Sequence, residues 1–367
     1  MEQKIKILTI NTAGLNRNGI TTVMYDYYSR FDNKRFDIHT VADETNNSQV
    51  RQSFHEANIV VHILPARKHN TAKYFFALIS LIRKYKIDII HVHGNSATVS
   101  IELLAAAIAG CKIRIAHSHN STCDAKKADH LLRPLFYRVY THAFACGQLA
   151  GEWLFGIRDF KIIKNGRDVN QYAFNEKIRE ETRKQLGLTD DTMAIGHIGN
   201  FNEQKNHTYL IKIFESLQHK KPDSKLFLAG YGHCESNIRS LVKELNLEDK
   251  IVFLGVINNV PDILQAMDVM VLPSLYEGLP LVVVEWQIAA LPCVISDTVT
   301  DECVYTDLVR FESLQNPYEM WAEKIVESVD DNRKNNVDGI IKLSQKNGYD
   351  INCNVRDLMQ FMEKIVK

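Results

Sequence analysis

Two glutamates, Glu277 and Glu285, stand eight residues apart around a turn that contains Gly278. An apolar run precedes the turn, and Pro280 after it suits the first position of a helix. Glu277 would lie in the loop, where its carboxylate could bind the hydroxyl groups of a sugar. Glu285 would lie about one turn into the helix and could accept hydrogen bonds from paired ribose hydroxyls. Alternatively, Glu285 only complements the helix dipole and Glu277 is a solvated loop residue.

The start of the same helix could bind an anion. The free N–H groups there would be those near Leu281 and Val282, and helix N-termini attract phosphate. A second phosphate ligand could be Lys205, which follows an apolar run and the glycine turn at Gly199. A lysine near a turn is usually just solvated, so Lys205 alone is a weak signal.

A glycine-containing loop near the N-terminus has the shape of a phosphate-binding loop. Gly14, Asn18 and Gly19 follow the first apolar run and precede a helical pattern over residues 21–28. Neither the full G-x-G-x-x-G fingerprint nor the G-K-[ST] ending of a P-loop is present. The sequence therefore argues against a nucleoside triphosphatase.

Four histidines form two pairs with the spacing of one strand face, His91 with His93 and His117 with His119. Four imidazoles at two strand ends could bind zinc. Neither segment has a carboxylate or a cysteine at a supporting spacing, so we favour a site without metal. One histidine would then line the ligand site while the others are structural. His119, followed by Asn120, would stand at the carboxyl end of its strand.

Strands and helices alternate along the chain. Short apolar runs typical of buried parallel strands recur at 6–10, 59–64, 87–92, 113–116 and 143–146, and again at 193–198, 225–229, 251–254, 268–272 and 292–295. Helical patterns such as 74–85 and 99–109 lie between them. This alternation predicts an α/β protein with two doubly wound, Rossmann-like parallel sheets. Because such sheets bind ligands at the carboxyl ends of their strands, we expect a site in a cleft between two domains.

A polar stretch without a strand signal, residues 170–185, marks the expected domain junction. We expect an N-terminal domain over 1–169 and a C-terminal domain over 170–349. The amphipathic C-terminal segment, about 350–367, is expected to pack back on the first domain as a helix. A length of 367 residues agrees with two domains.

The composition excludes several classes of protein. Hydrophobic residues make up 45% and charged residues 24%, as in globular proteins. No apolar run approaches the roughly 18 residues needed to span a bilayer. The first residues lack the hydrophobic segment of a secretory signal, so we expect a cytoplasmic location. The seven cysteines include no C-x-x-C pair, which favours reduced thiols over disulfides or a zinc site.

The net charge is zero, yet residues 1–170 carry +9 and the remainder −9. A basic half suggests an anionic partner, either nucleic acid or a membrane surface. No interleaved stripe of aromatic and basic residues occurs, which argues against nucleic acid. The alternative is two solvated surfaces that differ in charge. The candidate membrane contacts are Arg67, Lys68, Arg83, Lys84, Lys126, Lys127, Arg133 and Arg138.

Four stretches of the sequence are similar to those of a known family: RIAHSHN at 114–120, FNEQKNH at 201–207, VLPS with YEGLP within 271–280, and SDTVT at 296–300. The chain strongly resembles the retaining glycosyltransferases of family 4, which have the two-domain GT-B fold. The likeness is greatest to bacterial enzymes of capsule and exopolysaccharide synthesis. It covers essentially the whole chain and is densest over 193–303.

The resemblance implies a nucleotide-sugar donor. Glu285 would hold the ribose, Lys205 the diphosphate and Glu277 the donor sugar, while His119 would sit beside the transferred sugar. The further donor contacts implied are Gly19, Asn200, Val256, Ile257, Gly278, Leu279, Leu281 and Val282, and the contacts in the cleft toward the acceptor are His117 and Asn120. The family needs no metal or other cofactor. Here a lysine and helix-start N–H groups could neutralise the leaving diphosphate.

The resemblance also implies an acceptor and a mechanism. The acceptor would be a glycan, growing on a polyprenyl diphosphate lipid, that meets the basic N-terminal half at the inner face of the membrane. UDP is the favoured carrier by family frequency, and GDP is the alternative. No nucleophile for a double displacement is evident. The donor phosphate would therefore take the acceptor proton on the same face, while His119 and Glu277 orient the sugar.

Two residues depart from the family pattern. Asn200 stands where an arginine usually follows the strand-end glycine, and Trp286 stands where alanine is preferred. Losing the charged hydrogen bond of an arginine could weaken donor use by about tenfold to a hundredfold. The alternatives are a non-catalytic GT-B partner subunit that binds nucleotide without turnover, a nucleotide-sugar epimerase, and a glycan phosphorylase. A phosphorylase would need a pyridoxal phosphate lysine context, which is not found.

Overall fold

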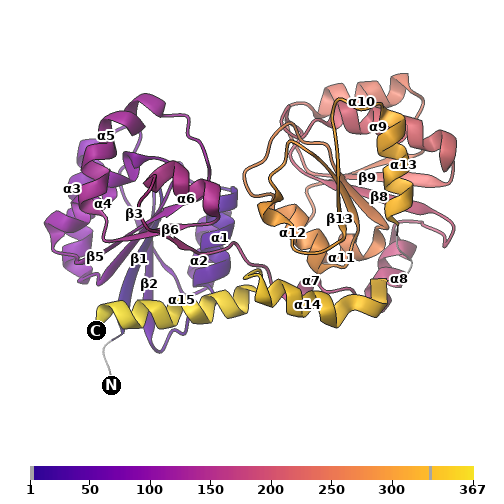
Figure 1. Ribbon diagram of the computed structural model, residues 1–367. Coiled ribbons are helices and arrows are strands. Elements are labelled where there is room, and N and C mark those ends of the chain that lie inside the picture. Colours follow the sequence, from indigo (N-terminus) through magenta and orange to yellow (C-terminus); the bar gives the residue numbers. More distant parts are fainter. Residues whose placement is uncertain (1–3, 330–332) are drawn as a thin grey trace. The chain divides into compact units, whose positions relative to one another are not determined.

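The computed structural model describes residues 4–329 and 333–367. The chain divides into two compact units (Figure 1), one comprising 1–167 with 350–367 and the other 168–349. The division falls between Arg167 and Asp168, and the expected junction was after residue 169. No described helix is both long enough and apolar enough to span a bilayer.

Unit 1 is a parallel seven-stranded sheet in the order β3-β2-β1-β4-β5-β6-β7, with helices on both faces (Figure 1). Its strands are rich in buried apolar residues because both faces are covered. The strands are β1 (Ile5–Asn11), β2 (Phe36–Ala42), β3 (Val60–Ile63), β4 (Ile89–His93), β5 (Ile113–Ser118), β6 (His142–Ala145) and β7 (Lys161–Ile162). The helices are α1 (Gly19–Tyr28), α2 (Ser48–Glu56), α3 (Thr71–Tyr85), α4 (Ser100–Ala109), α5 (Lys126–Val139), α6 (Gln148–Phe155) and α15 (Ile351–Val366), with a 3₁₀ turn at Ala97–Val99.

Unit 2 is a parallel six-stranded sheet in the order β10-β9-β8-β11-β12-β13. Apolar clusters lie on both of its faces. The strands are β8 (Met193–Ile198), β9 (Ser224–Ala229), β10 (Ile251–Gly255), β11 (Val269–Leu272), β12 (Cys293–Ser296) and β13 (Val309–Glu312). The helices are α7 (Val169–Tyr172), α8 (Glu176–Gln185), α9 (His207–Lys220), α10 (Glu235–Glu244), α11 (Val260–Ala266), α12 (Leu281–Ile288), α13 (Tyr318–Ser328) and α14 (Val337–Lys346), with 3₁₀ turns at Asp301–Cys303 and Arg333–Asn336.

The C-terminal helix α15 belongs to unit 1, where it packs against α1. Asn354 donates to the carbonyl of Lys164 at 3.1 Å, and the N–H of Ile351 donates to the carbonyl of Arg167. These bonds join the end of the first segment of unit 1, at residue 167, to the start of its second segment, at residue 350.

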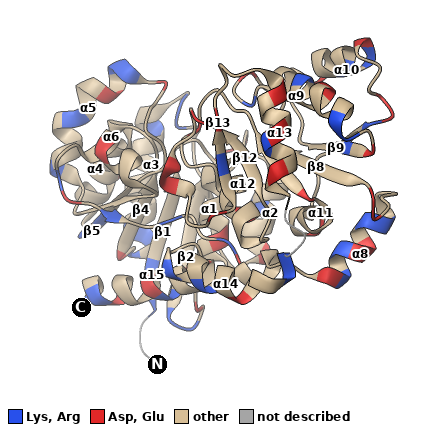
Figure 2. Ribbon diagram, turned by 45° about the vertical axis from the view of Figure 1, so that its right-hand side comes forward, with Lys and Arg blue, Asp and Glu red and all other residues tan. Residues whose placement is uncertain are grey.

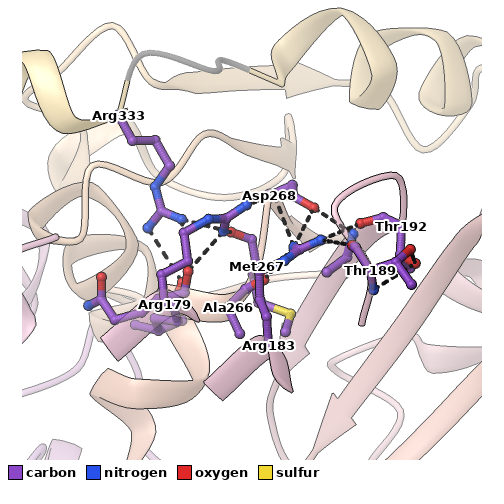
Figure 3. Close-up of polar contacts among 11 residues, drawn as sticks. Arg179, Arg183, Thr189, Thr192, Ala266, Met267, Asp268 and Arg333 are labelled. Carbon is purple, nitrogen blue, oxygen red and sulfur yellow. Dashed lines mark hydrogen bonds and ion pairs between the residues drawn. The ribbon is translucent and has the colours of Figure 1, made fainter. Parts of the chain in front are cut away.

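Three arginines bind helix α8 and the 3₁₀ turn at 333–336 to the segment just before β11 in unit 2. Figure 3 shows the guanidinium groups of Arg179, Arg183 and Arg333 gathered around Asp268 and the backbone before it. Asp268 directly precedes β11, so this cluster lies at the amino ends of the strands, opposite the edge where ligands bind in such sheets. Burial, with the nearby charge of Arg179, lowers the pKa of Arg333 to about 9. The arginines cap the carbonyl end of α11 and are structural.

Candidate functional site

An ion pair joins two loops at the carboxyl ends of β8 and β11. The Nζ atom of Lys205 lies 2.6 Å from Oε1 of Glu277, and their side chains are 15% and 9% exposed. Ser274 donates to the same carboxylate oxygen at 2.8 Å, and Gln204 donates to the other at 3.1 Å. Ser274 and Gln204 were not predicted from the sequence, whereas Lys205 and Glu277 were predicted to bind separate groups of a ligand.

The loops that carry this pair are bonded to one another. The N–H of Leu275 donates to the carbonyl of Gln204 at 2.8 Å. The hydroxyls of Ser296 and Thr298, from the SDTVT stretch, both donate to the carbonyl of Ser274, at 2.5 and 2.9 Å. The loop after β12 thus supports the loop after β11, which places Glu277.

Helix α12 begins beside Glu277. It starts at Leu281, and Pro280 is its N-cap. Pro280 therefore stands one residue before the first helical position, where it was expected. Gly278 and Leu279 lie in the turn before it, and Val282 lies in its first turn. Glu285 lies one turn into the helix and is only 6% exposed. Because the first backbone N–H groups of a helix have no carbonyl partner within it, this end can bind an anion.

Glycines bring the loop after β9 against the loop after β8. A Cβ atom on Gly230, whose φ is +145°, would lie 2.0 Å from the carbonyl oxygen of Gly199. A Cβ atom on Gly232, whose φ is +157°, would lie 2.3 Å from the carbonyl oxygen of Phe201. Any other residue would therefore separate the two loops. Asn200 lies between these contacts, and its side chain is exposed.

The loop after β10 lies at the same edge of the sheet. The N–H of Gly230 donates to the carbonyl of Gly255 at 2.8 Å, so the ends of β9 and β10 are joined. Val256 is 55% exposed, and Ile257 is partly exposed. Unit 2 thus places Lys205, Glu277, the start of α12 and this loop on one edge, as the sequence predicts for carboxyl strand ends.

Unit 1 holds the four histidines as two hydrogen-bonded rows. In the first row, Nδ1 of His91 lies 2.6 Å from the hydroxyl of Tyr28, and its Nε2 lies 3.1 Å from Nδ1 of His117. In the second, Nδ1 of His93 lies 2.8 Å from Nε2 of His119. The rows stack: the ring centroids of His91 and His93 are 4.1 Å apart, and those of His117 and His119 are 4.2 Å apart.

Burial lowers the pKa of all four imidazoles, which favours their neutral form. Burial, with smaller effects from neighbouring histidines, holds the pKa of His91, His93 and His117 well below the usual value. Burial lowers the pKa of His119 to about 3. These values do not suit His119 to carry a proton at neutral pH, and they leave it a hydrogen-bonding group.

Two further sequence-predicted residues lie at the carboxyl edge of unit 1. Asn120 is the second residue after β5, and its side-chain oxygen accepts from the N–H of Ser121 at 2.8 Å. Gly19 is the first residue of α1, whose N-cap is Asn18. No described atom lies within 4 Å of a Cβ built on Gly19, so a ligand can approach its backbone closely.

A cavity of about 160 Å³ opens at the carboxyl ends of β1, β2 and β3. Polar side chains dominate part of its wall, namely Asn11, Asn16, Asp43, Thr45 and Asn46. Such amide, hydroxyl and carboxylate groups match the hydroxyls of a sugar. This cavity was not predicted from the sequence, because its walls come from three loops that the fold brings together.

Among the described residues, two groups of side chains bring possible metal ligands close together. Ring nitrogens of His91, His93 and His117 lie within 4.8 Å of one another, but both nitrogens of His91 already have hydrogen-bond partners. The other group, Glu203 with His233 and Cys234, has an exposed acid and histidine that pair with one another at 3.1 Å. The absence of a metal requirement stays a prediction.

Two family models match the chain. Residues 178–338 match glycosyl transferases group 1, and residues 17–171 match glycosyltransferase family 4. The chain belongs to the family 4 glycosyltransferases. Its two Rossmann-like parallel-sheet units are the two domains of the GT-B fold, as the sequence predicts.

Relatives of this glycosyltransferase align over nearly its whole length. A putative glycosyltransferase EpsF of Bacillus subtilis (strain 168) is 29% identical, covering 95% of this chain and 94% of the relative. An Escherichia coli UDP-Gal:alpha-D-GlcNAc-diphosphoundecaprenol alpha-1,3-galactosyltransferase is 26% identical over the same shares. A capsular polysaccharide biosynthesis glycosyltransferase, CapH of Staphylococcus aureus, is 23% identical, covering 98% and 99%. The crystal structure of Anabaena HepE in complex with UDP has a TM-score of 0.81 at 17% identity, covering 98% of this chain and all of HepE.

Proposed function

We propose that this glycosyltransferase moves a sugar, with retention of configuration, from a nucleoside diphosphate sugar to a glycan or lipid-linked glycan in capsule or exopolysaccharide synthesis. The observation that carries this proposal is the Lys205–Glu277 pair beside the start of α12, with Glu285 one turn further on. UDP is the favoured carrier, as in the E. coli relative and in the ligand of HepE.

The donor diphosphate is bound by unit 2 without a metal. The ammonium group of Lys205 has three N–H donors and uses one on Glu277, so the others can bind phosphate oxygens. The first N–H groups of α12 face the same anion, and both stabilise the charge that develops as the diphosphate leaves. Glu285 accepts hydrogen bonds from the ribose hydroxyls, and the loop at Val256 and Ile257 meets the base.

The transfer takes place on one face of the sugar. The bond from the anomeric carbon to the diphosphate breaks, the acceptor oxygen bonds to that carbon, and the acceptor proton passes to a phosphate oxygen of the leaving group. Glu277 is neutralised by Lys205 and holds two further hydrogen bonds, so it serves better to orient the sugar than to attack it. In unit 1, the proposed sugar-orienting residue is His119, beside His117 and Asn120.

The acceptor is bound by unit 1. The polar cavity at the ends of β1–β3 suits a sugar, and the E. coli relative is named for a diphosphoundecaprenol-linked acceptor. Helix α5 carries basic residues (Figure 2). Lys126, Lys127 and Arg138 are exposed, and Leu131 on the same helix is 78% exposed. This basic and apolar surface suits peripheral binding to an anionic membrane.

Two of the basic residues expected at the membrane are engaged inside unit 1 instead. Arg67 pairs with the fully buried Glu102 at 2.5 Å. Arg133 pairs with Asp129 at 2.8 Å, and its guanidinium lies over the ring of Trp153. Removing either residue would leave a buried carboxylate without its partner, so their charge serves the fold.

The test combines melting with a transfer assay. The melting temperature is measured with UDP, GDP, ADP and their sugar conjugates, for the wild type and for Glu285→Ala. A ligand at 100 times its Kd adds about 2.7 kcal/mol, a shift of a few degrees. We expect a shift with UDP compounds that Glu285→Ala loses, and sugar transfer to a lipid-linked glycan. A shift without any transfer or donor turnover would favour a non-catalytic partner subunit, and conversion of donor without acceptor would favour an epimerase.

A further inference from the structure

The second row of histidines places a fully buried imidazole behind His119. His93 is 2% exposed, and its Nδ1 lies 2.8 Å from Nε2 of His119. Its other ring nitrogen, Nε2, is buried and has no hydrogen-bond partner among the described residues. His93 therefore makes one side-chain hydrogen bond, and that bond goes to His119.

The proton in this bond has two alternative positions. A neutral imidazole carries one N–H, so either His93 donates from Nδ1 or His119 donates from Nε2. If His119 donated, the single N–H of His93 would be on Nε2, a buried donor without an acceptor. If His93 donates, its Nε2 is only an unused acceptor. Orphaned buried donors are rarer in proteins than under-used acceptors.

We infer that His93 is a positioning residue that fixes His119 in the tautomer with its proton on Nδ1. The Nε2 atom of His119 is then occupied by His93, and its Nδ1 presents a donor. Within the described part of the chain, that Nδ1 has no hydrogen-bond partner. His119 therefore donates to an oxygen of the bound sugar and does not act as a base.

The surroundings hold this arrangement in place. The ring of His93 stacks on His91, which is itself fixed by Tyr28 and His117. The N–H of His119 donates to the side-chain oxygen of Asn95 at 3.2 Å, which fixes its backbone. The first row of histidines thus supports His93 without touching the Nε2 atom of His119.

The tautomer is measured directly by NMR. Long-range proton–nitrogen correlation of protein labelled with ¹⁵N-histidine distinguishes protonated from bare ring nitrogens, and His119→Gln assigns the signals of His119. We expect a protonated Nδ1 and a bare Nε2 in the wild type. The reverse pattern would overturn the inference. This measurement needs no activity, so it tests the tautomer independently of the proposed function. The catalytic consequence of the tautomer rests on the proposed function.

Matched variants test the consequence. His93→Asp offers only an acceptor and forces the proton of His119 onto Nε2, whereas His93→Asn can still donate. We expect kcat to fall about tenfold in His93→Asp, the worth of one hydrogen bond, with the donor KM nearly unchanged and with His93→Asn close to the wild type. His39→Asp is the control, because it buries the same carboxylate at a 3% exposed site of the same unit, where the ring of His39 contacts His62 and Tyr85 and neither row. An equal loss of kcat in His39→Asp, or a flipped tautomer with full activity, would contradict the inference.

Discussion

The ammonium group of Lys205 lies 2.6 Å from the carboxylate of Glu277, although 72 residues separate them in the chain. The pair couples two tasks that the sequence suggests separately, binding phosphate and binding sugar. A donor diphosphate bound by Lys205 would therefore bring the sugar to a carboxylate already held in place by Ser274 and Gln204.

Replacing Glu277 is expected to impair transfer even at saturating donor. Glu277→Gln keeps the shape of the side chain but removes the charge that orients Lys205 and accepts from the sugar. We expect kcat to fall by about 10²-fold, comparable to losing one preorganised group at a transition state. Glu235→Gln is the control, since Glu235 is a carboxylate that pairs with Arg239 at the surface of α10. An unchanged kcat in Glu277→Gln would show that Glu277 does not act on the transferred sugar.

Restoring an arginine at position 200 is expected to strengthen donor binding. The side chain of Asn200 is exposed at the edge that carries Lys205 and the start of α12, so a guanidinium there has room to reach the diphosphate. A charged hydrogen bond contributes about 1.5–3 kcal/mol, and we expect Asn200→Arg to lower the Kd for UDP by about tenfold or more in calorimetry. Asn200→Gln, which lengthens the side chain without a charge, should leave the Kd within about twofold. A Kd unchanged by the arginine would show that position 200 does not face the diphosphate.

Much of the fold could be predicted because buried parallel strands are continuous apolar runs, as in β8 and β11. The strands that were not identified are β2 (Phe36–Ala42) and β13 (Val309–Glu312), in which polar residues interrupt the apolar pattern, and β7 (Lys161–Ile162), which has only two residues. The candidate site was predicted only in part. The residues of the YEGLP turn follow a local pattern, whereas the support of Glu277 by Gln204 depends on where two distant loops meet.

The basic surface of α5 is expected to bring the enzyme to anionic membranes. Each Lys or Arg near such a surface contributes about 1 kcal/mol, so replacing Lys126, Lys127 and Arg138 together by Gln should weaken binding to phosphatidylglycerol vesicles by about 10²-fold. Added salt should weaken wild-type binding as well.

The control for the membrane prediction is a triple variant of unit 2, in which the exposed Lys177, Lys184 and Lys243 become Gln. It removes the same charge and should leave vesicle binding in a sedimentation assay near the wild-type value. Binding that is insensitive to both salt and the α5 variant would exclude this surface.

Asp268 is expected to be essential for the stability of unit 2. It pairs with two of the three clustered arginines, Arg179 and Arg183, and its Oδ2 also accepts from the N–H of Ala194 at 2.7 Å. Asp268→Asn would leave these two guanidinium groups without an anion; breaking a fully buried pair costs about 3–5 kcal/mol, an upper bound for this partly buried one. We expect the melting temperature to fall by several degrees. The exposed Asp249→Asn is the control, and a melting temperature equal to the wild type in both variants would show that the backbone carbonyls suffice for the arginines.

The buried histidines make stability sensitive to acid. Burial lowers the pKa of His62 and His207 to about 4, and it holds the pKa values of His91, His93 and His117 well below the usual value. These groups bind protons more strongly in the unfolded chain, where the pKa is about 6.5. The free energy of unfolding is therefore at its full value above about pH 6.5. As the pH falls toward 4, each group lowers it by about 1.4 kcal/mol per pH unit.

His207 offers a clean test of this acid sensitivity. Its ring stacks on Phe201 with centroids 4.1 Å apart, and neither ring nitrogen has a hydrogen-bond partner within the described chain. Phenylalanine keeps the stack and removes both the orphaned nitrogens and the titration. We expect His207→Phe to be at least as stable as the wild type at pH 7.5 and to lose less of its melting temperature between pH 6.5 and 4.5. His219→Gln, at an exposed position, should follow the wild type. If His207→Phe were as acid-sensitive as the wild type, protonation of this imidazole would not contribute to unfolding.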